Sequence, residues 1–129
     1  MSPQEFLQAL RQTLGAEAVL SGDAVPARYH TDWSGTPPVA PLALVRPRST
    51  EDVSATLRLC HQHRVPVVPQ GGLTGLAGAA VPSADCVALS LERMPAIEAI
   101  DARSATMTVQ AGATLQAVQE AAVAAGMVF

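Results

Sequence analysis

The chain has 129 residues, 49% of them hydrophobic and 15% charged, which is typical of one small globular domain. Its formal net charge is −3, and all eight basic residues are arginines because the sequence contains no lysine. These features disfavour a lysine-dependent phosphate loop, a Schiff-base enzyme and a nucleic-acid-binding protein. No stretch approaches the roughly 18 apolar residues of a membrane span, and the polar start is unlike an export signal. We therefore expect no membrane span and a cytoplasmic location.

The first part of the chain predicts one helix and an irregular arm. Ser2 and Glu5 form a capping-box pattern, and the apolar spacing that follows predicts a helix over 3–14. Residues 21–41 carry several glycines and prolines with little periodicity, so we expect an irregular arm there. We treat residues 1–38 as an N-terminal helix and arm.

A strand, a helix and a second strand follow the arm. The apolar run at 42–45 predicts a short buried strand, and the capping pattern at Ser49 predicts the start of a helix. Pro66 limits that helix, and the run at 65–68 predicts the next strand. A helical crossover of this length argues for parallel pairing of the two strands.

The last third of the chain predicts a third buried strand, a hairpin and a helix. The apolar run at 86–89 comes first, and alternating segments at 97–101 and 106–110 flank a polar turn. A helix over 114–125 follows, and residues 127–129 resemble the beginning of a further strand.

These elements predict an α+β fold. A small, mostly parallel sheet flanked by helices is followed by the start of an antiparallel subdomain, and together they make up residues 39–129.

The cysteine and histidine residues do not predict a metal site. Cys60 and Cys86 lack metal-ligand spacing, and we expect both to be buried apolar groups. His61 and His63 lie beside Arg64 near a predicted helix C-terminus, where positive charge complements the helix dipole.

A glycine-rich segment after the second strand holds the clearest functional pattern. Gly71, Gly72, Gly75 and Gly78 follow a predicted strand, where the backbone must turn sharply or let a ligand approach closely. Successive main-chain amides can bind phosphate oxygens without a cationic side chain, so an anion is the favoured ligand. The spacing differs from the dinucleotide fingerprint, and glycine spacing alone leaves a flexible link between strands equally open.

Several ordered blocks resemble one family. The run from Pro41 to Gly126 is similar to the first part of the FAD-binding domain of the p-cresol methylhydroxylase and vanillyl-alcohol oxidase superfamily. Within it the likeness is to the branch of the glycolate oxidase flavoprotein subunit, D-lactate dehydrogenase and D-2-hydroxyglutarate dehydrogenase. The matching blocks are Val45-Arg46-Pro47, Ser49-Thr50-Glu51-Asp52-Val53, Pro66 to Gly72 with Thr74-Gly75-Leu76, Leu89 to Met94, and Val109 to Ala113, preceded by Tyr29 and Asp32-Trp33-Ser34-Gly35.

The resemblance implies a set of FAD-binding residues. The loop would wrap the FAD diphosphate through main-chain amides, with Met94 and the Ala111-Gly112 turn along the cofactor. The loop residues are Pro69, Gln70, Gly71, Gly72, Leu73, Thr74, Gly75, Leu76 and Gly78. Leu73 departs from the family, in which a small polar residue is common. No His or Cys occurs between Pro69 and Ala80, so we expect non-covalent FAD.

By the same resemblance, the whole protein would oxidise a small D-2-hydroxy acid to a 2-oxo acid. The family's FAD domain continues past Phe129, so a missing C-terminal half or a partner subunit is expected, and no catalytic residue can be named in this chain. A reductase that makes UDP-N-acetylmuramate is a less similar member of the same fold. A stand-alone or truncated nucleotide- or phosphate-binding module without catalysis is the alternative from another class.

Overall fold

The computed structural model describes residues 1–129 and begins with the predicted capped helix. Helix α1 (Pro3–Leu14) starts where the Ser2 hydroxyl accepts the Glu5 N–H and the Glu5 carboxylate accepts the Ser2 N–H. Gly15 ends it with φ at 91°, a backbone conformation that glycine adopts readily because it has no Cβ atom. Helix α2 (Thr50–His63) starts at the predicted cap Ser49. Both predicted helices are confirmed.

A four-stranded sheet forms the centre of the larger part of the fold. Its order is β1 (Val19–Leu20), β2 (Ala43–Val45), β4 (Val87–Ser90) and β3 (Val67–Gln70). β4 pairs in parallel with both neighbours, while β1 runs antiparallel to β2. The sheet is thus mostly parallel and has helices against it, as the predicted α+β class requires.

Two details of the sheet differ from the sequence-based expectation. β2 and β3 are parallel but do not pair with each other, because β4, which comes later in the chain, lies between them. β3 begins two residues later than predicted, since the Val65 N–H donates to the Cys60 carbonyl and so still closes the end of α2. It extends through Pro69, which an edge strand tolerates.

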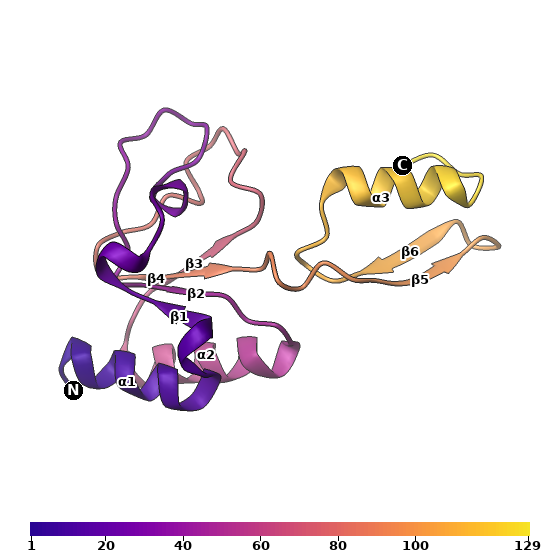
Figure 1. The fold of residues 1–129 in the computed structure, drawn as a ribbon. Coiled ribbons are helices and arrows are strands. Elements are labelled where there is room, and N and C mark those ends of the chain that lie inside the picture. Colours follow the sequence, from indigo (N-terminus) through magenta and orange to yellow (C-terminus); the bar gives the residue numbers. More distant parts are fainter.

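The two faces of the sheet are covered differently. Helices α1 and α2 lie side by side on one face, and the segments that contain residues 21–41 and 71–86 lie on the other (Figure 1). The helix-side core includes Phe6, Leu10 and Val19 together with Val45 and Val87. Residues 1–38 therefore share a core with later residues, and the division of the chain at residue 38 stays a prediction.

The C-terminal part forms a second unit beyond the sheet. Strands β5 (Ile97–Asp101) and β6 (Thr106–Val109) form the predicted antiparallel hairpin. Helix α3 (Leu115–Ala124), capped by Thr114, lies alongside the hairpin, away from the central sheet (Figure 1). Residues 127–129 form no strand. No helix of the chain has both the length and the apolar character to cross a bilayer.

Candidate functional site

A loop of residues 71–78, here called the glycine loop, leaves the carboxyl end of β3. Gly71 and Gly72 are exposed, and a Cβ atom built on either would meet no atom within 4 Å. Neither glycine has a positive φ. Because neither packing nor backbone conformation demands glycine here, the missing side chains leave open space beside the main chain.

The glycine loop keeps its main-chain donors free. No backbone N–H of residues 71–77 donates a hydrogen bond within the chain, although the Gly75 carbonyl accepts the Trp33 N–H at 3.0 Å. A run of unpaired N–H groups outside regular structure can bind an anion. This backbone geometry supplies partial positive charge without a lysine or arginine.

Gln70, the last residue of β3, fixes the start of the loop. Its side chain is 1% exposed, and its Nε2 donates to the Tyr29 carbonyl at 2.9 Å and to the Ala80 carbonyl at 3.0 Å. Both partners are acceptors, so the amide nitrogen must face them. The side chain thereby ties the two ends of the loop to the arm.

Leu73 lies in a left-handed backbone conformation with φ at 62°. That conformation has a free-energy cost for an L-residue with a Cβ atom, so it is found more often at Gly or Asn. Its side chain packs against the small cluster of Val25, Tyr29, Leu44 and Ala88, which offsets the cost. The departure from a small polar residue thus has a structural role as an anchor of the loop.

The arm forms the opposite wall of a pocket beside the glycine loop. The pocket has a volume of about 280 Å³ and is lined by residues of the arm and of the loop: Arg28, Thr31, Asp32, Trp33, Gly72, Leu73 and Thr74. Trp33 is 71% exposed, so its indole is available to a ligand. Loop donors, an aromatic ring and open space meet at this pocket.

Asp32 is a buried carboxylate that packs next to the glycine loop. Its Oδ1 accepts the Ser34 N–H at 2.8 Å, while its Oδ2 is buried without a hydrogen-bond partner. Hydrogen bonds from the side chain and backbone of Ser34 lower the pKa of Asp32, so the carboxyl is ionised at neutral pH. Oδ2 lies 4.0 Å from the Cβ position of Gly75, and the backbone N–H groups of Ala80 and Gly78 make smaller contributions to the lowered pKa.

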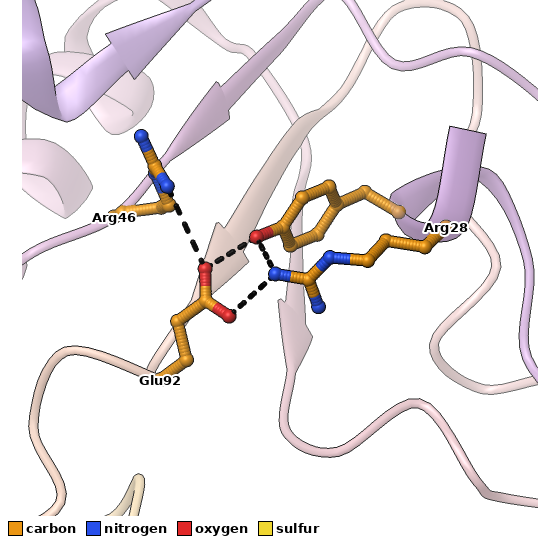
Figure 2. A network of polar contacts seen from close by, with 4 residues as sticks. Arg28, Arg46 and Glu92 are labelled. Carbon is orange, nitrogen blue, oxygen red and sulfur yellow. Dashed lines mark hydrogen bonds and ion pairs between the residues drawn. The ribbon is translucent and has the colours of Figure 1, made fainter. Parts of the chain in front are cut away.

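A charged network fastens the arm to the chain just after β4. Arg28 and Arg46 converge on the carboxylate of Glu92, at 2.8 and 3.9 Å (Figure 2). The buried Tyr29 hydroxyl donates to the same carboxylate and accepts from Arg28. Burial opposes ionisation of Glu92, but the hydrogen bonds from Tyr29 and Arg28 and the two arginine charges outweigh it and lower its pKa.

The remaining predicted cofactor residues lie at a second place. Pro69, Met94 and Ala111 line an apolar pocket of about 480 Å³ together with Val53 and Leu57 of α2. This pocket lies on the helix side of the sheet, whereas the arm and the glycine loop lie on the other side. The structure therefore brings the predicted residues together as two groups.

Gly112 has a steric role. Its N–H donates to the Met94 carbonyl at 2.9 Å, and a Cβ atom on it would lie 1.7 Å from the Leu91 carbonyl oxygen. Two turns of the chain therefore touch at a position that only glycine can occupy. Gly112 is needed for the fold itself, whatever the ligand.

The cysteine and histidine residues lie outside both groups. Cys60 and Cys86 are buried, as predicted, and burial, with a smaller effect of Cys86, raises the pKa of Cys60 to about 11. His61 and His63 occupy the last turn of α2. No three His, Cys, Asp or Glu side chains come together in a way that could hold a metal ion.

Sequence reasoning missed the roles of Asp32 and Glu92. Both residues stand in blocks that carry the family resemblance, but neither was singled out as part of the site. An Asp two residues before a Ser is typical of a side-chain turn and was a usable signal for Asp32. The Arg28–Glu92 contact spans 64 residues, so no local pattern reveals it.

Comparison with known proteins assigns the chain to a family and shows related enzymes. The family model described as "FAD binding domain" matches residues 41–129. D-2-hydroxyglutarate dehydrogenase of Xanthomonas citri pv. viticola is 39% identical over 121 residues, 94% of this chain and 26% of that protein. D-lactate dehydrogenase of Archaeoglobus fulgidus is 40% identical over 100 residues, 73% of this chain and 22% of that protein. The chain thus spans about a quarter of the length of these relatives.

Solved structures have the same fold. 4-Ethylphenol oxidase from Gulosibacter chungangensis aligns with a TM-score of 0.83 and 25% identity, covering 95% of this chain and 24% of that one. p-Cresol methylhydroxylase aligns with a TM-score of 0.81 and 23% identity, covering 96% of this chain and 25% of that one. The predicted α+β architecture is confirmed by this agreement.

Proposed function

The chain belongs to the FAD-binding domain family, and we propose that it holds FAD non-covalently through the main-chain N–H groups of residues 71–77. The observation that carries this proposal is that none of those N–H groups has a partner within the chain. Unpaired amides of a curled loop are suited to the oxygens of a diphosphate. The open space at Gly71 and Gly72 lets such a group approach the backbone closely.

The two groups of residues suit different parts of FAD. The glycine loop offers polar backbone to the diphosphate, while Pro69, Met94 and Ala111 offer an apolar wall to a ring system. Gly112 would act by keeping the Met94 turn in place. The absence of His and Cys between residues 69 and 80 supports a dissociable cofactor, because this loop has no residue to form a covalent link.

We further propose that the chain is the N-terminal FAD-binding portion of an oxidoreductase that converts a small D-2-hydroxy acid to a 2-oxo acid. The described activities of the relatives support this assignment. Bound FAD supplies an acceptor for two electrons from the substrate. This chain would bind and orient the cofactor, and a further segment or partner subunit would supply the groups that hold the acid. A cytoplasmic location is part of the proposal, although several relatives are described as mitochondrial.

The test is a flavin titration of wild type and Gly72→Val. A valine at this exposed position should leave the fold unchanged but block close approach to the backbone, so FAD affinity should fall at least about tenfold. Quenching of flavin fluorescence measures affinity, and thermal unfolding checks the fold. Ala84→Val is the matched control, because it adds a similar side chain to an exposed turn outside both pockets.

The titration separates the alternatives. Equal FAD affinity in Gly72→Val and wild type, with both folded, would remove the glycine loop from the proposal. The same titration is run on a longer chain that contains this segment, since the relatives are about four times as long. If ADP binds and FAD does not in either chain, the protein is a nucleotide-binding module and the oxidoreductase assignment is wrong.

A further inference from the structure

A polar pocket separate from both FAD groups lies at the end of α1. It has a volume of about 410 Å³ and lies between residues 14–18, the link from β2 to α2, and Arg93. Its charged lining residues are Arg46, Arg48, Arg93, Glu17 and Asp52. Three of the chain's eight arginines therefore share one pocket, although the chain as a whole is acidic.

The three guanidinium groups that line this pocket outnumber its two carboxylates, those of Glu17 and Asp52. The ion pairs of the chain are formed by Glu92 with Arg28 and Arg46. Arg48 and Arg93 therefore form no ion pair. Asp52 lines the pocket, but its Oδ2 accepts the backbone N–H of Arg48 at 3.1 Å rather than a guanidinium. The Nε of Arg46 is buried and has no acceptor. An anion in the pocket would supply acceptors to Arg48 and Arg93 and relieve repulsion between the guanidinium groups.

The chemistry of the lining indicates the class of ligand. A guanidinium binds carboxylate or phosphate oxygens through parallel hydrogen bonds, and arginine is a favoured residue for the recognition of phosphate. The volume lies in the range of small-molecule sites. Glu17 and Asp52 disfavour a second anionic group on the same ligand, because like charges repel.

We propose that this pocket is a second binding site, which takes the phosphate group of a small phosphate monoester. The site is independent of the proposed FAD function, since none of its lining residues belongs to the glycine loop or to the apolar pocket. The arginines bind the phosphate, and the remainder of the ligand, uncharged, lies toward Glu17 and Asp52.

The experiment measures thermal unfolding of the 129-residue chain in inorganic phosphate and in sodium chloride of equal ionic strength. At a pH of about 8 phosphate is a dianion, and matched ionic strength removes general screening. Binding to the folded state raises the unfolding temperature. Wild type should show this rise, and Arg48→Gln and Arg93→Gln should each bind phosphate about tenfold more weakly, as expected for loss of a hydrogen bond to a charged group.

The control is Arg103→Gln, which removes the same charge from the exposed hairpin turn and should keep the full response. Phosphorus NMR of glycerol phosphate with wild-type protein gives a second measurement that does not depend on any variant folding. The proposal is overturned by no rise in wild type, by an equal rise in both pocket variants, or by unchanged glycerol phosphate signals. A larger rise with succinate than with phosphate would also overturn it, because the site would then be a carboxylate site.

Discussion

Gly72 and Gly112 both stand in blocks that resemble the FAD-binding family, but they meet different physical demands. Gly72 has open space at its Cβ position, whereas a Cβ atom on Gly112 would lie 1.7 Å from a backbone oxygen. The first glycine is unnecessary for folding, and the second is required by contact between two turns. A glycine that the fold does not require is therefore a stronger indication of a ligand than a glycine that the fold needs.

The largest expected effect is that of Gly112→Ala. The new methyl group must push apart the Leu91 and Met94 turns, so we expect a loss of about 3 kcal/mol or more in the free energy of unfolding, measured with urea. Gly72→Ala is the matched control and should change stability by no more than about 0.5 kcal/mol. Similar losses in the two variants would mean that the two glycines do not differ in their importance for folding.

Gln70→Leu tests whether the position of the glycine loop depends on a side chain outside it. The substitution leaves the Tyr29 and Ala80 carbonyls without the Gln70 donor, so we expect a loss of about 2 kcal/mol in the free energy of unfolding. Flavin affinity should fall as well, because the loop loses its tie to the arm. Gln62→Leu, on the exposed end of α2, is the control. A variant of unchanged stability would show that the two hydrogen bonds do not hold the loop.

Glu92→Gln has the smallest expected effect and a defined pH dependence. Folding lowers the pKa of Glu92 from its ordinary value of 4.5. The ionised carboxylate therefore stabilises the fold fully at pH values above 4.5, and this stabilisation is lost as the pH falls through the lowered pKa of the folded chain. Glu92 is partly exposed, and we expect the variant to lose only about 1 kcal/mol at neutral pH.

The stability difference between Glu92→Gln and wild type should therefore shrink in acid. Urea unfolding at several pH values measures it, and Glu98→Gln on the exposed hairpin is the control. A difference that stays constant down to a pH of about 3 would mean that the charge of Glu92 is not what fastens the arm.

Much of the fold could be predicted because its signals are local. The cap at Ser2, the cap at Ser49 and the alternation in the 97–109 hairpin act over a few residues, and the structure confirms each. The order of the strands in the sheet could not be predicted from the sequence, because no periodicity in the chain encodes which strand pairs with which. In the structure β4 lies between β2 and β3. The two-residue strand β1 was too short to leave a pattern.

The candidate site divides in the same way. The amino-acid pattern alone predicts that a glycine-rich loop without a cationic side chain follows a strand, and several blocks of the chain resemble one FAD-binding family. Only the tertiary structure decided that the loop amides stay free and that Asp32 lies beside them. It also decided that Gly112 serves packing, because steric contact depends on distance in space between segments far apart in the chain.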